Sequence, residues 1–165
     1  MIDPAWQADL KRYPRRPWLK EQSIYAIAVY RFGRRIDRRS GRWQARCLLP
    51  FYWLGFRLVE TLTGISLPKS AEIGPGLKIW HFGNVFVHPE AVLGANCTLR
   101  QGVTIGNRHE GGPVPRLDDD VELGAYAQLL GGIRVGRGAK VGAMAVLLCD
   151  VPDGGVAVGN PARIL

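Results

Sequence analysis

The chain has 165 residues, of which 47% are apolar and 22% are charged, with 22 Lys and Arg against 14 Asp and Glu. That apolar fraction supports a folded core and excludes an intrinsically disordered chain. Cys47, Cys97 and Cys149 are an odd, widely spaced set, which predicts reduced thiols and matches no zinc-site spacing. The polar, proline-containing opening segment does not fit a cleavable signal, and no uncharged apolar run reaches the roughly 18 residues of a membrane-spanning helix.

The charge is concentrated in the first part of the chain. Residues 1–66 hold 13 Lys and Arg against 5 Asp and Glu, a net charge of +8, whereas residues 67–165 hold nine of each kind. Of the 15 aromatic residues, 11 also precede residue 67. We therefore expect two domains: a basic, aromatic-rich helical N-terminal region over 1–66 and a second domain over 67–165.

The first region predicts one extended segment and two helices. Residues 1–18 contain Pro4, Pro14 and Pro17, which predicts extended backbone. Residues 20–38 predict a helix whose apolar face is Tyr25, Val29, Phe32 and Ile36, flanked by Arg31, Arg34, Arg35, Arg38 and Arg39. A second, almost entirely apolar helix is expected to open at Pro50 and to close at Gly64.

Two interpretations of this region stay open. Arginine together with Trp and Tyr on amphipathic helices is typical of peripheral contact with an anionic membrane surface. Alternatively, the helices pack on the second domain and keep their arginines in water. Nucleic-acid binding is not expected, because no recognition motif is present.

The second region is a repeat with a period of six residues. Thirteen positions in this register, interrupted by a two-residue insertion and by one further irregular stretch, are all Leu, Ile or Val. Glycine often follows, and a small or apolar residue comes four positions later. The thirteen positions are Leu67, Ile73, Ile79, Val87, Leu93, Leu99, Ile105, Leu117, Leu123, Leu129, Val135, Val141 and Leu147.

A period of six fits neither a helix nor simple strand alternation. It fits a coil in which each hexad is one short strand and a turn, with the large aliphatic pointing inward and the glycine supplying a backbone conformation that other residues resist. The alternative is a glycine-rich β-sandwich with coincidental spacing, which thirteen matches without exception disfavour.

The chain resembles the hexapeptide-repeat acyltransferases, most closely their serine acetyltransferase branch. The resemblance lies in these hexads, in the segment Gln101-Gly-Val-Thr-Ile-Gly-Asn107 and in the ending Val158-Gly-Asn-Pro-Ala-Arg163. The resemblance covers residues 65–165. It implies a mainly β fold, a left-handed parallel β-helix, here preceded by the short helical region. It also implies a homotrimer with sites between subunits and acetyl-CoA as co-substrate. The helical region is shorter than in typical members, so a simple trimer is expected.

Acyl transfer to a hydroxyl requires a base, and histidine suits that role. His81 stands two residues after the inward position Ile79, just before the two-residue insertion, and resembles the family's general base. His109 falls in the second irregularity, where Glu110-Gly-Gly-Pro-Val-Pro115 predicts a loop. Arg108 and His109 resemble a pair in the family that contacts the acceptor. Counting back from Leu117, however, the family's histidine falls at Val114. His109 is therefore equally well interpreted as a loop residue without a catalytic role.

His88 is expected to be structural or exposed, because it opens a hexad beside Pro89. No metal is expected, because the three histidines lack the close pair of the zinc-dependent carbonic anhydrase relatives.

Two departures from the branch bear on the acceptor. Ser66 stands where the family has an aspartate that orients the base, and Trp80 stands where it has an aspartate that holds the amino group of serine. An ammonium ligand requires a carboxylate, whereas an indole suits stacking on a sugar ring. The sequence therefore predicts a sugar hydroxyl as acceptor.

The donor groove is expected on the later coils. By resemblance, Ala125, Lys140 and Ala143 line it, and Arg163 adds a cation for the phosphates of coenzyme A. Small residues there let the pantetheine arm run close to the backbone.

The expected function is acetyl-CoA-dependent O-acetylation of a sugar or oligosaccharide in bacterial exopolysaccharide biosynthesis, with His81 as base. Relatives of this branch that have a short N-terminal region occur in such pathways, which supports the expectation by analogy only. Two alternatives stay open: a serine O-acetyltransferase of cysteine biosynthesis, and a non-catalytic β-helical scaffold. The expected location is the cytoplasm, at the inner face of the cell membrane if the helices bind it.

Overall fold

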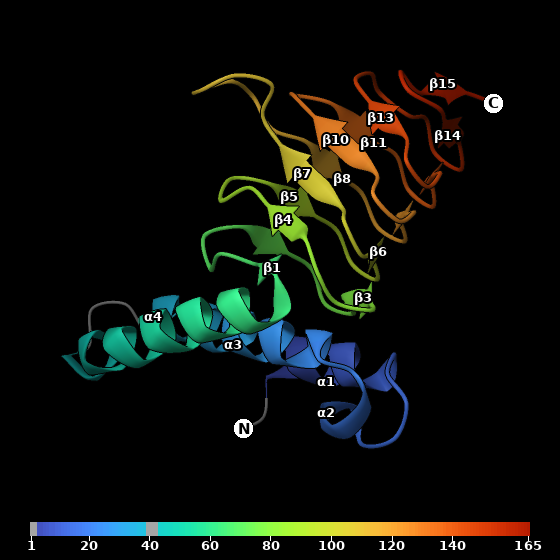
Figure 1. Ribbon diagram of the computed structural model, residues 1–165. Helices are drawn as coiled ribbons and strands as arrows, with labels where there is room; N and C mark the ends of the chain where they lie inside the picture. The colour runs from blue at the N-terminus through green and yellow to red at the C-terminus, as the bar shows by residue number, and fades with distance from the viewer. Residues whose placement is uncertain (1–2, 39–42) are drawn as a thin grey trace.

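The computed structural model describes residues 3–38 and 43–165, in which helices at one end lead into a β-helix that rises away from them (Figure 1). Arg39 lies outside the described residues. The helices are α1 (Pro4–Lys11), α2 (Pro17–Lys20), α3 (Ser23–Asp37) and α4 (Trp43–Thr63).

The expectation of extended backbone over residues 1–18 is wrong, because two of its prolines open helices. Pro4 is the first residue of α1, and the Asp3 carboxylate caps that helix by accepting a hydrogen bond from the Ala5 N–H at 2.9 Å. Pro17 is likewise the first residue of α2, although its N-cap residue Arg16 makes no capping hydrogen bond through its side chain. The first N–H of a helix has no intrahelical partner, so proline loses nothing at that position.

The two longer helices differ from prediction in detail. α3 forms within the expected span, but it buries Ile24, Ile27 and Tyr30, and Tyr25 is exposed. α4 begins before Pro50, which lies exposed inside the helix. It ends as predicted at Gly64, which has φ +65° and donates its N–H to the Glu60 carbonyl at 2.8 Å.

The strands form three parallel sheets, here called faces A, B and C, as expected of a left-handed parallel β-helix. The chain visits A, B and C in turn. Face A contains β1 (Ile65–Ser66), β4 (Val85–Val87), β7 (Thr104–Gly106), β10 (Gln128–Leu130) and β13 (Val146–Leu147). Face B contains β2 (Glu72–Ile73), β5 (Val92–Leu93), β8 (Arg116–Leu117) and β11 (Arg134–Val135). Face C contains β3 (Lys78–Trp80), β6 (Thr98–Arg100), β9 (Glu122–Leu123), β12 (Lys140–Val141), β14 (Val156–Val158) and the antiparallel β15 (Arg163–Ile164).

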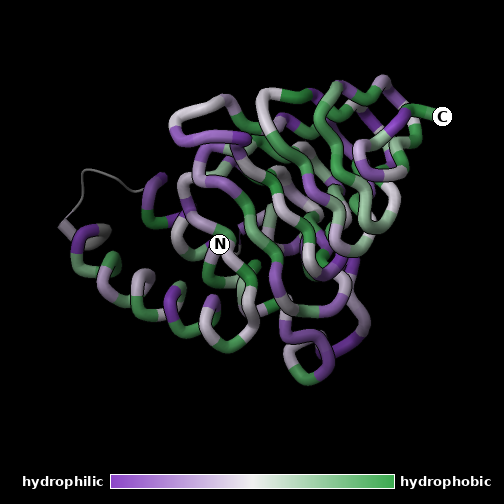
Figure 2. Tube along the Cα trace, turned by 45° about the horizontal axis from the view of Figure 1, so that its top comes forward, coloured by the Kyte–Doolittle hydropathy of each residue, from purple (hydrophilic) through white to green (hydrophobic). Residues whose placement is uncertain are grey.

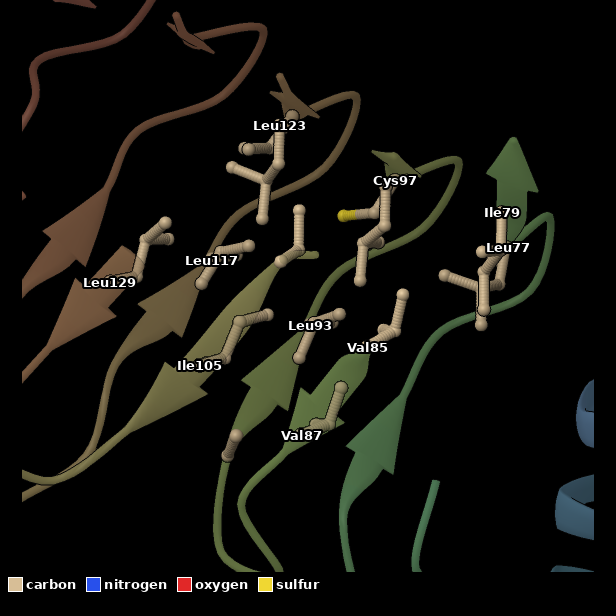
Figure 3. Packing of buried hydrophobic residues seen from close by; sticks show 14 of the residues in the cluster. Leu77, Ile79, Val85, Val87, Leu93, Cys97, Ile105, Leu117, Leu123 and Leu129 are labelled. Carbon is tan, nitrogen blue, oxygen red and sulfur yellow. The ribbon is translucent and has the colours of Figure 1, made fainter. Parts of the chain in front are cut away.

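The core is the interior of this coil. All thirteen predicted hexad positions are buried. Figure 3 shows some of them, and Val87, Ile105 and Leu129 follow one another in a column from coil to coil. The strand register gives the same stacking, since Ile79 lies opposite Leu99, and Leu99 opposite Leu123. Burial of these aliphatics from coil to coil is what makes a period of six a stable structure.

The two irregularities in the repeat lie at different edges of the coil. Residues 81–84, 101–103, 124–127 and 142–145 turn from face C to face A and are called the CA edge. Residues 88–91, 107–115, 131–133 and 148–150 turn from face A to face B and are called the AB edge. The two-residue insertion is at the start of the CA edge, and the predicted loop after Gly106 leaves from the AB edge.

The glycines of the repeat have a different purpose from the one predicted. Gly94 and Gly124 do not have a positive φ. A Cβ built on Gly124 would instead lie 2.4 Å from the Ala143 nitrogen of the next coil, and one on Gly94 would lie 2.6 Å from the Asp119 nitrogen. Glycine at these positions therefore permits close stacking of coils rather than an unusual backbone angle.

The helices close the first coil of the β-helix with polar side chains. The Asp9 carboxylate accepts hydrogen bonds from the Gly76 and Leu77 N–H groups at 2.8 Å, and Arg31 donates to the Ile73 carbonyl at 2.8 Å. Asp9 and Arg31 also form a buried ion pair at 2.7 Å. The prediction that the arginines stay in water is therefore wrong for Arg31, because that side chain satisfies the unpaired edge of β2.

α4 presents an apolar face to the outside. Exposed large side chains recur at helical spacing along it, and hydrophobic residues are visible around its turns in Figure 2. The side chains are Trp43, Phe51, Leu54, Leu58 and Leu62, and the stripe that they form is called the α4 stripe. Within the described residues, none of the helices combines the length and apolar character that crossing a bilayer requires.

Candidate active site

A groove of about 580 Å³ runs along face C and opens onto the CA edge. Its floor is formed by residues of β3, β6, β9, β12 and β14. These residues stack because successive coils of the solenoid place equivalent positions over one another. It is lined by Arg12, Lys78, Trp80, Thr98, Arg100, Glu122, Leu123, Gly124, Ala125, Lys140, Val141, Gly142, Ala143 and Val156.

His81 stands on the CA edge, directly after the groove residue Trp80. It is exposed and has φ +64°, the left-handed conformation that this edge also imposes on Tyr126 and Met144. The imidazole and the Trp80 indole lie with ring centroids 6.4 Å apart. The turn therefore projects the imidazole away from the core, one residue from the groove, although His81 is not itself among the groove-lining residues. An exposed imidazole at this edge can be reached by a substrate hydroxyl.

Three of the four predicted donor residues, Ala125, Lys140 and Ala143, line the same groove. Ala125 and Ala143 lie on the CA edge in successive coils, joined by the Met144 N–H to the Ala125 carbonyl at 2.8 Å. Lys140 lies on β12, with its ammonium 3.7 Å from the Glu122 carboxylate. Arg163 is exposed on β15 of the same sheet and is not among the groove-lining residues.

The two positions that depart from the family pattern lie on different faces. Ser66 is half-buried on β1 of face A, and it makes no side-chain hydrogen bond within the described ranges. Trp80 is 39% exposed on face C. The Lys78 ammonium lies 3.8 Å from the indole centroid, so one face of this ring is already occupied by a cation.

Arg108 and His109 lie on the AB edge, whereas the groove lies on face C and opens onto the CA edge. They line a second pocket of about 490 Å³ together with Pro113, Leu148, Cys149 and Asp150, among others. Arg108 donates hydrogen bonds to the Leu130 carbonyl at 3.2 Å and to the Leu148 carbonyl. One protomer therefore does not bring the predicted pair of His81 and His109 to a common edge.

His88 takes part in its own turn, where its Nδ1 accepts a hydrogen bond from the Glu90 N–H at 3.2 Å. Cys97 points into the core, where burial raises the pKa of its thiol to about 11. Within residues 3–38 and 43–165, no group of three or more His, Cys, Asp or Glu side chains is arranged to hold a metal ion.

Three groove cations were not predicted from the sequence. Lys78 and Arg100 flank Trp80, and Arg100 could have been found by counting one coil forward from that residue, since the two are register partners. Arg12 enters from the end of α1, and no periodicity in the sequence relates it to the repeat.

No protein-family model matches the chain. Curated relatives do. The chain is 35% identical over 144 residues to a serine acetyltransferase of Helicobacter pylori, covering 86% of this chain and 80% of the relative. It is 33% identical over 149 residues to a serine acetyltransferase of Bacillus licheniformis, covering 89% of this chain and 66% of the relative.

Solved structures agree with this result. The soybean serine acetyltransferase apoenzyme superposes with a TM-score of 0.84 at 32% identity, covering 99% of this chain and 70% of that one. The soybean enzyme complexed with serine gives a TM-score of 0.84 at 31% identity, with the same coverage. The likeness extends through the helical region as well as the β-helix.

These comparisons contradict the predicted sugar acceptor and the predicted place in exopolysaccharide biosynthesis, because the relatives that match over most of the chain are named serine acetyltransferases. The prediction relied on an indole open for stacking, and the Lys78 ammonium covers one face of that indole. The expected acyltransferase activity is supported, and the scaffold alternative is not. The chain belongs to the serine acetyltransferase family of hexapeptide-repeat acyltransferases.

Proposed function

We propose that the protein is a serine O-acetyltransferase that uses acetyl-CoA, with His81 as general base. The observation that supports this most strongly is the 35% identity to a named serine acetyltransferase across 80% of that relative's length. The exposed position of His81, next in sequence to the groove residue Trp80, supports the assignment of the base.

In this mechanism the His81 imidazole accepts the proton of the serine hydroxyl while the oxygen attacks the thioester carbon. The carbon–sulfur bond then breaks, the acetyl group stays on the serine oxygen, and the imidazolium returns the proton to the departing thiolate. A backbone N–H steadies the oxyanion of the tetrahedral intermediate. Ala125 and Ala143 give the pantetheine arm space along the CA edge, and Lys140 attracts the phosphates from within the groove. Arg163 adds a cation outside the groove lining, on β15 of the same sheet.

The test is direct transfer to L-serine by the purified chain, followed by the release of the coenzyme A thiol. For His81→Ala we expect kcat to fall about 10²- to 10⁴-fold, the usual contribution of a positioned base, with the fold intact by circular dichroism. Retained turnover in a correctly folded variant would remove His81 from this role. No transfer by the unmodified chain would remove the proposed function.

We also propose that the working unit is a trimer. Because the His81 groove and the Arg108–His109 pocket lie on different edges of one coil, a complete site requires the AB edge of one protomer beside the CA edge of another. Native mass spectrometry should give three chains per particle. Co-refolding His81→Ala with His109→Ala should restore part of the activity that each variant lacks, because mixed trimers then contain one intact site; failure to do so would contradict shared sites.

The helical region supports a further proposal, peripheral contact with an anionic membrane. The α4 stripe lies beside the exposed cations Arg46 and Arg57, and Glu60 is the only acidic residue of that helix. We expect co-sedimentation with anionic vesicles at low salt, reduced at high salt and by Leu54→Ser with Leu58→Ser. Equal binding to neutral vesicles, or none to anionic ones, would contradict it.

A further inference from the structure

Three cations surround Trp80 on face C. Lys78 is two residues away on β3, and its ammonium lies over the indole. Arg100 on β6 is the parallel register partner of Trp80, so their Cα atoms are neighbours across one strand spacing of about 4.8 Å. Arg12 reaches the same groove from the end of α1. Two β-strands and a helix thus converge on one small region.

Neutral acceptors hold Arg12 in place without neutralising it. Its guanidinium donates to the Gly76 and Asn96 carbonyls at 2.6 Å and to the Thr98 hydroxyl at 2.9 Å. Partial burial lowers the pKa of the nearby Lys78, and the positive charge of Arg12 lowers it further, while Glu21 opposes both effects. The positive charge of Arg12 therefore contributes to the electrostatic potential inside the groove.

Acidic partners for these cations are scarce. Among the residues that the structure describes, Glu122 is the one carboxylate that lines the groove, and it lies beside Lys140 at 3.7 Å. Asp120 lines a neighbouring pocket together with Arg12 and Glu122. Within the described residues, none of the ion pairs involves Arg12, Lys78 or Arg100. Like charges that share a groove repel one another, and an anion that binds between them removes that repulsion.

The other arginine near a candidate site is not available in this way. The Arg108 guanidinium is turned onto the Leu130 and Leu148 carbonyls of its own coils. Arg100, by contrast, is exposed and makes no side-chain hydrogen bond within residues 3–38 and 43–165. Its N–H fork has the planar, two-pronged geometry that matches a carboxylate.

We propose that Arg100, assisted by Lys78, binds the carboxylate of the amino-acid acceptor beside His81. This inference rests on the proposed serine acetylation and adds to it the group that orients the acceptor. Because Arg100 is the register partner of Trp80 and His81 follows Trp80 directly, both residues adjoin the indole, and an acceptor held by its carboxylate at Arg100 can direct its hydroxyl toward the imidazole. The cations near Trp80 repel an ammonium, so the carboxylate dominates acceptor recognition in this chain.

Three acceptors separate the two charged groups of serine: L-serine itself, L-serinamide, which lacks the carboxylate, and 3-hydroxypropanoate, which lacks the ammonium. The unmodified chain should prefer 3-hydroxypropanoate to L-serinamide. Arg100→Ala should raise the KM for L-serine about 10- to 100-fold, the usual effect of losing a charged hydrogen-bonding pair, and leave the KM for acetyl-CoA unchanged. Lys78→Met should have a smaller effect in the same direction.

Arg116→Ala is the matched control, since Arg116 is an exposed arginine on face B, away from the groove. Titration calorimetry with L-serine should show the same loss for Arg100→Ala without any turnover. Equal losses for L-serine and L-serinamide, an effect on acetyl-CoA alone, or no effect would overturn the carboxylate assignment. If the unmodified chain acetylates no L-serine, the proposed function fails together with this inference; normal turnover with an unaffected Arg100→Ala removes the inference alone.

Discussion

At the residue scale, burial decides which thiols can react. Cys97 points into the β-helix, where desolvation raises the pKa of its thiol to about 11, whereas Cys47 and Cys149 are exposed. The thiolate is the reactive form, so at about pH 8 roughly one Cys97 thiol in 10³ is reactive even when reagent reaches it.

We therefore expect a disulfide reagent to label two of the three cysteines in the native protein near pH 8. The third should react only on unfolding, because the unfolded chain exposes Cys97. Quantitative labelling of three thiols in the folded protein would contradict the burial of this residue, and Cys97→Ala identifies which thiol is protected.

Residue chemistry also explains how far the candidate site follows from the sequence. The edge position of His81 could be predicted from the inward phase of the hexad repeat and the two-residue insertion, whereas its role as the base stays a prediction. The surroundings of Trp80 could not be predicted, because they depend on Lys78 lying over the ring and on Arg12 arriving from a helix about 65 residues earlier in the chain. Such contacts are set by packing between elements.

At the element scale, close stacking of coils predicts that one glycine tolerates no side chain while another does. Gly124→Ala places a Cβ 2.4 Å from the Ala143 nitrogen, so we expect a loss of about 1–3 kcal/mol in the free energy of unfolding. Gly106→Ala meets nothing within 4 Å and should change it by no more than about 1 kcal/mol. Chemical denaturation of both variants measures the difference; equal losses would contradict the stacking explanation.

The docking of α1 and α3 depends on the buried pair of Asp9 and Arg31. Arg31→Met leaves the Asp9 carboxylate buried without its partner, and we expect a loss of about 3–5 kcal/mol. Arg57→Met removes the exposed pair with Glu60 and should cost no more than about 1 kcal/mol. Similar losses for the two variants, by urea denaturation, would contradict this difference.

Elements differed in how well the sequence predicted them for a simple reason. The hexad repeat gives the same signal at thirteen positions, so a single irregular stretch does not obscure the period. Each N-terminal helix, by contrast, has only one short stretch of sequence to indicate it. Proline is favourable at the first position of a helix, where Pro4 lies, and unfavourable in the interior, where Pro50 lies. Which case applies depends on where the helix begins, and Asp3 as a cap was the one local signal for α1.

At the scale of the whole molecule, α3 and the β-helix share one core, and α4 packs on α3 through a second cluster of Ile36, Tyr52 and Phe56. A continuous set of buried side chains runs from Tyr13 and Tyr30 in the helical region to Ala157 on β14. We therefore expect a single cooperative unfolding transition, in which the far-UV signal and tryptophan fluorescence change together. Four of the five tryptophans are in helices, so fluorescence reports mainly on that region. Separate transitions would contradict a shared core.

The polar closure of the first coil has a consequence for the solubility of the protein. A solenoid ends in an open strand edge, and such an edge can recruit the edge of another molecule and grow into fibres. Here Tyr13, Tyr30 and Asp9 occupy the hydrogen-bonding groups of Ile79, Ile73 and Leu77 at one end. The antiparallel β15 covers β14 at the other. The N-terminal helices thus block end-to-end polymerisation at the first coil. A chain shortened at its N-terminus would leave these N–H groups free to pair with another molecule.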